Sequence, residues 1–229
     1  MKLHNDWWIL EDEDDDGYSR YSREQGNWQN NLGTRAVYAC DNYNVAIDIG
    51  ACYGAFSRIF AESFEKVISF EVHPDFIPPF WENVKPYTNI ELHNIGLWSS
   101  REDRKIRRHS YGGQTSVIEY GSTTHDWKVK TKGSGSDAHR GSITAELRTL
   151  DSFNFEKIDI IKIDVEMAEC HVIYGAMETL ARCKPLVVVE VGMDQTETIT
   201  HFMLTELLNY QLMYKQKCDR IYKWKSDER

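Results

Sequence analysis

The chain has 229 residues, a length within the range of one large domain, and no low-complexity tract divides it into two comparable halves. Hydrophobic residues make up 41% and charged residues 28% of it, as expected for a globular protein with a solvated surface. The formal net charge of -9 would repel a nucleic acid backbone, and no apolar run approaches the ~20 residues of a membrane span, so neither is an expected partner.

The N-terminal segment, residues 1–43, precedes the regular part of the sequence. It contains the pair Trp7 and Trp8, an acidic run from Glu11 to Asp16, and a polar stretch from Trp28 to Tyr38 that could form an amphipathic helix. We predict that this segment is an extension or a lid. Acidic residues stand where a signal peptide would have its apolar core, and the odd number of cysteines, without a C-x-x-C pair, favours reduced thiols. We therefore expect a cytoplasmic protein.

From residue 44 onward, short apolar runs alternate with helix-length segments, which predicts a mostly parallel sheet with crossover helices in a domain over residues 44–229. The expected strands are Val45–Ile49, Lys66–Glu71, Ile90–Asn94, Ile158–Asp164 and Leu186–Val191. The expected helices are Ala55–Ser63, Pro74–Lys85, Ala168–Arg182 and Thr196–Leu208. Two final runs, Gln211–Lys215 and Arg220–Trp224, predict an antiparallel hairpin that closes the sheet.

Periodicity fails over residues 110–142, which are rich in Gly, Ser and Thr. A long insertion of this kind in a compact domain is usually functional or disordered. We predict a substrate-side loop with a short hairpin through Trp127–Lys130, and plain flexibility is the alternative. The preceding basic run, Arg101–Arg108, is short and contains two acidic residues, so it does not change the expectation about nucleic acid.

A glycine turn, D-x-G-x-x-x-G from Asp48 to Gly54, follows the first apolar strand. In an open parallel sheet, ligands bind beyond the carboxyl ends of the strands. Gly50 can adopt a positive φ or let another group approach the backbone, and Gly54 can open the next helix and let it pack closely on the strand. The buried Asp48 either holds the turn or meets a cationic partner such as a sulfonium or an amino group, and both interpretations remain open.

A second acid, Glu71, ends the next strand about 20 residues after Gly50, where a carboxylate can accept hydrogen bonds from ribose hydroxyls. The spacing of the glycines nevertheless departs from G-x-G-x-x-G, and the turn lacks the Lys and Ser/Thr of a phosphate-binding loop. The pattern therefore predicts a nucleoside cofactor without a phosphate chain, which describes S-adenosylmethionine.

A third acidic group lies in D-I-I-K-I-D-V-E-M-A-E, residues 159–169, which gathers Lys162, Asp164 and Glu166 around one strand end. These side chains could bind the methionine part of the cofactor, deprotonate a nucleophile or hold a divalent metal. The alternative is an ion-paired strand end that only begins a helix. We assign no metal ligands. Glu190, within the apolar V-V-V-E-V, needs a partner if it is buried, and both a structural and a substrate-binding role remain open.

Five segments, in this order, resemble the FkbM-type S-adenosylmethionine-dependent methyltransferases. They are VAIDIGACYG (45–54), VISFEVHP (67–74), TLDS (149–152), DIIKIDVEMAE (159–169) and PLVVVEV (185–191). The resemblance implies a Rossmann-like class I methyltransferase fold, an α/β architecture with a seven-stranded, mostly parallel sheet and an antiparallel last strand. It also implies S-adenosylmethionine as cofactor and methylation of a hydroxyl oxygen on a sugar, glycan precursor or small natural product.

The resemblance also implies roles for individual residues. It assigns to the cofactor the side chains or backbone of Asp48, Gly50, Ala51, Gly54, Glu71 and Asn94, with Glu71 at the ribose and Asn94 toward the adenine.

On the acceptor side, the resemblance places Asp164 and Glu166 next to the transferring methyl group, where either could be the base, and His73 is an alternative base. His171 lies inside a predicted helix and is expected to point away. The family usually has Gly where Met167 stands.

Two other functions remain as alternatives. A nicotinamide-dependent reductase is disfavoured by the altered glycine spacing and by the absence of a Tyr-x-x-x-Lys proton donor. A module without catalysis could bind a cofactor or a partner through Trp7, Trp8 and the Gly/Ser-rich insertion. The expected partner of the enzyme is a small molecule or a saccharide, and its oligomeric state is not predicted.

Overall fold

The computed structural model describes the chain except residues 5, 12–30, 109–114, 118–141, 192–194 and 227–229. The hairpin predicted through Trp127–Lys130 and most of the acidic run from Glu11 to Asp16 lie outside the described residues. Within the described part of the chain, no helix combines the length and the apolar character needed to cross a membrane.

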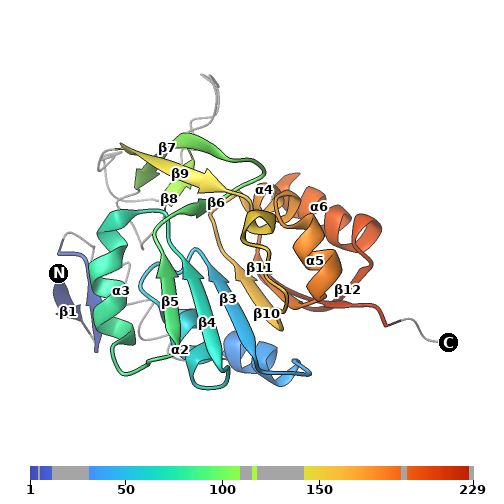
Figure 1. Ribbon diagram of the computed structural model, residues 1–229, viewed down its shortest axis with the longest axis horizontal. Coiled ribbons are helices and arrows are strands. Elements are labelled where there is room, and N and C mark those ends of the chain that lie inside the picture. The colour runs from blue at the N-terminus through green and yellow to red at the C-terminus, as the bar shows by residue number, and fades with distance from the viewer. Residues whose placement is uncertain (5, 12–30, 109–114, 118–141, 192–194, 227–229) are drawn as a thin grey trace.

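A seven-stranded sheet forms the centre of the molecule, with strand order β12-β13-β11-β10-β3-β4-β5 (Figure 1). Its parallel strands are β3 (Val45–Ile49), β4 (Lys66–Phe70), β5 (Ile90–His93), β10 (Ile160–Ile163) and β11 (Leu186–Glu190). The antiparallel strands are β12 (Tyr210–Gln216) and β13 (Asp219–Trp224). The predicted α/β fold with a mostly parallel sheet and an antiparallel C-terminal hairpin is confirmed.

The crossover helices are α2 (Ala55–Ala61), α3 (Ile77–Val84), α4 (Glu169–Tyr174), α5 (Met177–Cys183) and α6 (Gln195–Phe202). Short 3-10 helices cover Pro74–Phe76 and Leu150–Phe153, residues 31–38 are helical, and a π-helical segment, Met203–Leu207, extends α6.

The prediction of a single helix over Ala168–Arg182 is wrong. The helix is interrupted at Gly175, so that α4 and α5 are separate helices. A Cβ on Gly175 would lie 1.9 Å from the backbone oxygen of Trp98. The apolar period continues across this break, which is why the sequence predicts one helix instead of two.

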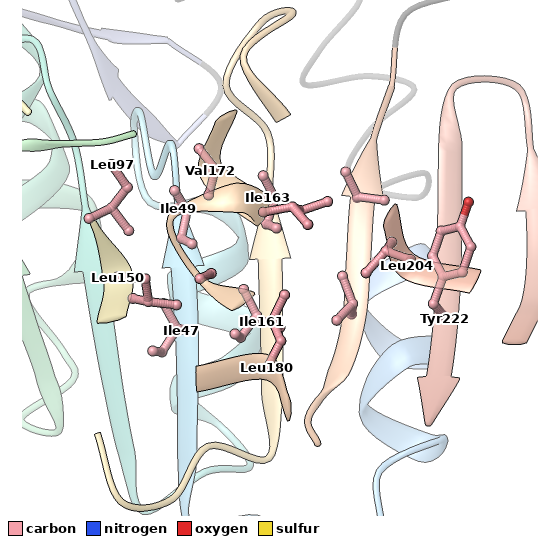
Figure 2. Close-up of a cluster of buried hydrophobic side chains, with 14 of the residues drawn as sticks. Ile47, Ile49, Leu97, Leu150, Ile161, Ile163, Val172, Leu180, Leu204 and Tyr222 are labelled. Atoms are coloured by element: carbon pink, nitrogen blue, oxygen red, sulfur yellow. The ribbon is translucent and has the colours of Figure 1, made fainter. Parts of the chain in front are cut away.

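Apolar side chains cover both faces of the main sheet, as the near-continuous apolar strands predict. On one face, the branched side chains of β3 and β10 pack against α4, α5 and the segment after α6 (Figure 2). On the other face, the alternate residues pack against α2 and the helix at 31–38. The residues drawn in Figure 2 include Ile47, Ile49, Ile161, Ile163, Val172, Leu180 and Leu204.

A hairpin of β1 (Lys2–His4) and β2 (Trp7–Ile9) begins the chain and docks on α3. The backbone N–H of Trp8 donates to Asn83 Oδ1 at 2.7 Å, and Asn83 Nδ2 donates back to the oxygen of Trp8 at 2.9 Å. Arg58 lies over the Trp7 ring at 4.6 Å. The tryptophan pair is therefore half-buried and held by the domain.

A second sheet lies between β5 and β10 in the sequence, in the order β6-β9-β7-β8. Its strands are β6 (Gly96–Leu97), β7 (Glu102–Arg108), β8 (Thr115–Val117) and β9 (Ser142–Arg148). It lies above the main sheet in Figure 1, and it contacts the loops that follow β4 and β10 through Val72 and Val165. Thr115–Val117 and Ser142, which are the described residues of the predicted insertion at 110–142, therefore belong to a sheet that the sequence did not indicate.

Candidate functional site

The glycine turn follows β3 and is tied to the end of β4. The backbone N–H groups of Gly50 and Ala51 both donate to the oxygen of Phe70, at 2.9 and 3.0 Å. Gly50 and Gly54 have φ values of 81° and 90°, which confirms the predicted need for glycine. A Cβ on Gly54 would lie 2.8 Å from Val84 of α3, so the close packing that Gly54 allows is with that helix and not, as predicted, with the strand.

Asp48 is buried on the α2 face of the sheet. The Ser57 hydroxyl of α2 donates to Asp48 Oδ2 at 2.6 Å and lies 2.9 Å from the hydroxyl of Ser69 on β4. Burial raises the pKa of Asp48 to about 6, and the neighbouring ammonium of Lys162 opposes this shift. The carboxyl group therefore joins helix α2 to the central strands and lies near a cation, Lys162, and its role toward a cofactor stays a prediction.

Glu71 is buried immediately after β4, beside the glycine turn. Its Oε2 accepts the backbone N–H of Cys52 and its Oε1 accepts that of His73, both at 2.8 Å. Burial raises the pKa of Glu71 to about 7. A carboxylate can accept further hydrogen bonds on both oxygens, so Glu71 can bind hydroxyl groups from the position that it holds at the turn.

His73, a candidate base, is buried and begins the 3-10 helix before α3. Its Nδ1 accepts the backbone N–H of Asp75 at 3.3 Å, and its ring contacts Phe76 with centroids 5.7 Å apart. The imidazole therefore has a capping role on the cofactor side of the edge, next to Glu71.

Asn94 follows β5 directly. Its Nδ2 donates to the backbone oxygens of Glu71 and Val72, at 2.7 and 3.2 Å. The amide group therefore holds the segment that carries Glu71 in place.

Asp164 follows β10 and pairs with a buried lysine. Lys162 has only 1% of its side chain exposed, and its Nζ lies 3.1 Å from Asp164 Oδ2, whereas 24% of the Asp164 side chain is exposed. The backbone N–H of Asp164 donates to the oxygen of Ile49 at 3.0 Å, directly before the glycine turn. The structure therefore brings the predicted acidic motif next to the predicted cofactor turn, and both Asp164 and Glu166 of that motif are partly accessible.

The residues after Asp164 bend sharply. Glu166 and Met167 both have left-handed backbone conformations, with φ values of 50° and 73°. A left-handed residue is usually glycine because a side chain strains that conformation, so Met167 occupies a position that suits Gly. This agrees with the difference between the chain and the FkbM pattern at residue 167.

The second sheet supports this loop from one side. Val165 and Ala168 pack with Trp98, Ile106 and Leu147, residues from or next to that sheet. The His171 ring stacks on the Trp98 ring with centroids 3.8 Å apart. His171 therefore lies against Trp98, and its orientation away from the acceptor stays a prediction.

Two acidic residues on neighbouring strands also lie at this edge. The last residue of β11, Glu190, pairs in register with Asp219 at the start of β13. Both acids add negative charge near Lys162 and oppose the lowering of its pKa by burial. Among the described residues, no group of three or more His, Cys, Asp or Glu is arranged to hold a metal ion.

Together, these residues form an edge with two parts. One part is the glycine turn with Glu71, which offers hydrogen-bond acceptors to a polar ligand such as a nucleoside. The other part is Asp164 with Lys162, which offers an accessible carboxylate that can accept a proton or bind a hydroxyl group.

Comparison with protein families gives a match over residues 48–219, more than half of the chain, to the model described as the methyltransferase FkbM domain. No curated protein sequence matches the chain.

Several solved structures have a similar fold. An FkbM methyltransferase from Methylobacillus flagellatus KT has a TM-score of 0.53 and 16% identity, over 80% of this chain and 44% of that protein. The chain therefore spans less than half of that protein's length. A Streptococcus mutans protein proposed to be a methyltransferase, solved in complex with SAH, has a TM-score of 0.51 and 12% identity. The match covers 83% of this chain and 93% of that protein. An rRNA methylase from Streptococcus thermophilus has a TM-score of 0.50 and 11% identity, and the match covers 85% of this chain and 95% of that protein. The likeness confirms the Rossmann-like class I methyltransferase fold.

Proposed function

The chain belongs to the methyltransferase FkbM domain family, and on that premise we propose that it is an S-adenosylmethionine-dependent O-methyltransferase. The acceptor in this proposal is a hydroxyl group of a sugar, a glycan precursor or a small natural product. The resemblance found in five segments of the sequence is confirmed by the family match. The cofactor that accompanies this family is S-adenosylmethionine.

The observation that carries the proposal is the position of Glu71. Its buried carboxyl group lies at the end of β4 and accepts the N–H of Cys52 from within the glycine turn. This is where a nucleoside-binding fold has the acid that accepts the ribose hydroxyls. The residues at the edge therefore fit an adenosine-bearing group, which Glu71 and the turn from Gly50 to Gly54 would hold.

Bound S-adenosylmethionine would supply a methyl group on a cationic sulfur, which becomes a neutral thioether when the methyl carbon forms its bond to the acceptor oxygen. The protein must align the acceptor and remove the hydroxyl proton. We assign proton removal to Asp164, because it is partly exposed and lies against the strand end that precedes the turn. Lys162 stabilises the ionised form of this carboxyl group.

The net charge of -9 supports a small-molecule or saccharide acceptor over a nucleic acid. An rRNA methylase has a similar fold, so fold alone does not distinguish these acceptors. The distinction rests on charge and needs a direct assay.

Calorimetry with S-adenosylmethionine tests the cofactor site. We expect binding to the wild type, weaker binding to Asp48→Ala and Glu71→Ala, and wild-type affinity in Asp164→Asn. NAD, titrated in parallel, should give no heat of binding. Equal affinity in all four proteins would remove the assignment of the site.

A labelled methyl donor tests the reaction. The wild type, incubated with a panel of sugars and nucleotide sugars, should transfer label to at least one hydroxyl-bearing acceptor, and Asp164→Asn should transfer at least tenfold less. Transfer to nitrogen or carbon atoms only would contradict O-methylation.

A further inference from the structure

The register of the sheet places Glu190 beside Asp164. Ile163 of β10 pairs with Val189 of β11, and the two strands are parallel. The next residues of the two chain segments, Asp164 and Glu190, therefore lie side by side at the edge of the sheet. Side chains alternate along a strand, which puts both acids on the same face as Lys162. The ion pair between Lys162 and Asp164 agrees with this placement.

Several carboxyl groups lie near Lys162. Asp164 and Glu190 lie on neighbouring strands, and the buried Asp219 pairs with Glu190 in the antiparallel register. All three add negative charge near the buried ammonium, which also neighbours Asp48, and Glu166 in the following loop adds negative charge near Glu190. Carboxylates that share a site cannot all ionise, so at least one of them retains a proton. The charge of Asp164, together with burial, raises the pKa of Glu190 well above its ordinary range, which identifies Glu190 as the protonated member.

Glu190 is half-buried, so part of its side chain remains accessible to solvent. The described residues include an ion-pair partner for Asp164 but none for Glu190, whose carboxyl group interacts with its neighbours through charge alone.

A second, independent observation concerns Glu169 in the same loop. Its Oε1 accepts the backbone N–H of Met167 at 3.0 Å, but its Oε2 has no hydrogen-bond partner although the residue is only 2% exposed. Asp164 is near enough for its charge to add to the effect of burial on the Glu169 carboxyl group. A buried oxygen without a partner is costly, and protonation of the Glu169 carboxyl group, whose pKa burial raises, lowers that cost.

We propose that Glu190 is a further residue of the acceptor site, where it shares a proton with Asp164 so that the pair binds an uncharged, hydroxyl-bearing acceptor. This rests on the proposed function. Asp164 accepts the hydrogen bond of the hydroxyl that is to be methylated, and the Glu190 carboxyl group donates to a neighbouring oxygen of the acceptor. When the acceptor oxygen bonds to the methyl carbon and the carbon–sulfur bond breaks, the hydroxyl proton passes to Asp164.

The charge of this edge also restricts the acceptor. A phosphate or carboxylate next to the reacting hydroxyl would lie near the negative charges of Asp164 and Glu166, and the Lys162 ammonium is already paired with Asp164. The proposal therefore specifies neutral sugars or polyols at the methylated end and excludes uronic acids and sugars phosphorylated on the adjacent carbon.

The shared proton is tested by the melting temperatures of the wild type and Glu190→Gln between about pH 5 and about pH 8. A carboxyl group with a raised pKa binds its proton more tightly in the folded state, so the wild type loses stability as the pH rises through this range. The glutamine has no proton to release. We expect similar melting temperatures at the acidic end and an advantage for Glu190→Gln that grows toward the alkaline end.

Glu65→Gln, which removes an exposed carboxylate, is the matched control and should follow the wild type at every pH. Parallel curves for Glu190→Gln and the wild type would overturn the proposal. If Glu190→Gln does not fold, carbon-13 NMR of carboxyl-labelled wild type decides the same question, because Glu190 must then titrate well above the exposed glutamates.

The acceptor class is tested with a labelled methyl donor and matched pairs of methyl glycosides and uronic acids. We expect label only in the neutral member, a loss of at least tenfold in Glu190→Ala, and a smaller loss in Glu190→Gln, whose amide can still donate a hydrogen bond to the acceptor. Equal labelling of the acidic members, or an unaffected Glu190→Ala, would overturn the proposal. Absence of S-adenosylmethionine binding would instead contradict the proposed function, and the pH measurement would still decide whether Glu190 shares a proton.

Discussion

A side chain on Gly50 would collide with the backbone of Asp164, because its Cβ would lie 1.8 Å from the Asp164 carbonyl oxygen. The N–H of Asp164 in turn donates to the oxygen of Ile49, one residue before Gly50. The glycine turn and the acidic loop are therefore packed backbone against backbone. The two parts of the proposed site, for cofactor and acceptor, are held at a fixed separation by this contact.

Gly50→Ala should destabilise the protein by about 3 kcal/mol or more, because the collision is with backbone and the φ of 81° also strains a non-glycine residue. Urea unfolding followed by circular dichroism measures this loss. Gly33→Ala is the control, since its Cβ would meet side chains and no backbone: Ile59 Cδ1 at 2.8 Å, Ile59 Cγ2 at 3.0 Å and Phe56 at 3.5 Å. A loss in Gly50→Ala no larger than in Gly33→Ala would contradict the backbone contact.

Cofactor affinity should depend on pH through Glu71. Burial raises the pKa of this carboxyl group to about 7, and only its ionised form accepts hydrogen bonds on both oxygens. We expect the Kd for S-adenosylhomocysteine to weaken by up to about tenfold per pH unit below pH 7 and to level off above it. Calorimetry from pH 5.5 to pH 8.5 measures this dependence.

The control is Glu71→Gln, which binds more weakly at high pH but cannot titrate. Its affinity should stay constant through the range in which that of the wild type changes. The same shift affects folding: the folded pKa lies above the ordinary value of 4.5, so wild-type stability should fall as the pH rises from 4.5 to about 7, and Glu71→Gln should lack this fall. A flat wild-type binding curve would mean that Glu71 does not contact the cofactor.

Met167→Gly should stabilise the protein by about 1 kcal/mol, because glycine adopts the left-handed conformation without strain. The Met167 side chain is 41% exposed, so its removal leaves little cavity. The control is Met213→Gly in β12, an exposed methionine without a positive φ, which should lose stability. Thermal unfolding compares the two variants, and a loss in both would show that the Met167 side chain contributes more than the strain costs.

The order of the main strands and their edge residues were predictable from the sequence. Strands covered on both faces are apolar throughout, so β3 and β11 stand out, and an acid at the end of each parallel strand must lie at the same edge. Asp48, Glu71 and Asp164 are found together for that reason.

The second sheet was not predictable, because the inward positions of β7 include charged residues. Arg104 lies over the Trp98 ring at 4.6 Å and forms an ion pair with Glu102 at 3.1 Å. Both residues are half-buried, but their charge makes the sequence predict that they face solvent. The capping role of His73 and the backbone contacts of Asn94 were also missed, because they depend on loop geometry that no spacing encodes.

The buried ammonium of Lys162 supports the last prediction, since it is the cation that neutralises Asp164 and offsets Glu190 and Asp219. Lys162→Met should raise the pKa of Glu190 further, so that the folded state binds more protons and loses stability as the pH rises. We expect a loss of about 3 kcal/mol at pH 8 and a smaller loss at pH 5. Urea unfolding at both values measures it.

The control for this prediction is Lys66→Met, which removes a lysine with 51% of its side chain exposed and an ion pair with Glu91 at 2.7 Å. An exposed pair contributes about 0–1 kcal/mol, so this variant should show little loss at pH 8. If Lys162→Met lost the same amount at both pH values, the cause would be altered packing against Phe56, whose ring lies 5.0 Å from the Lys162 ammonium. Only a loss that grows with pH assigns to Lys162 the charge balance on which the acceptor site depends.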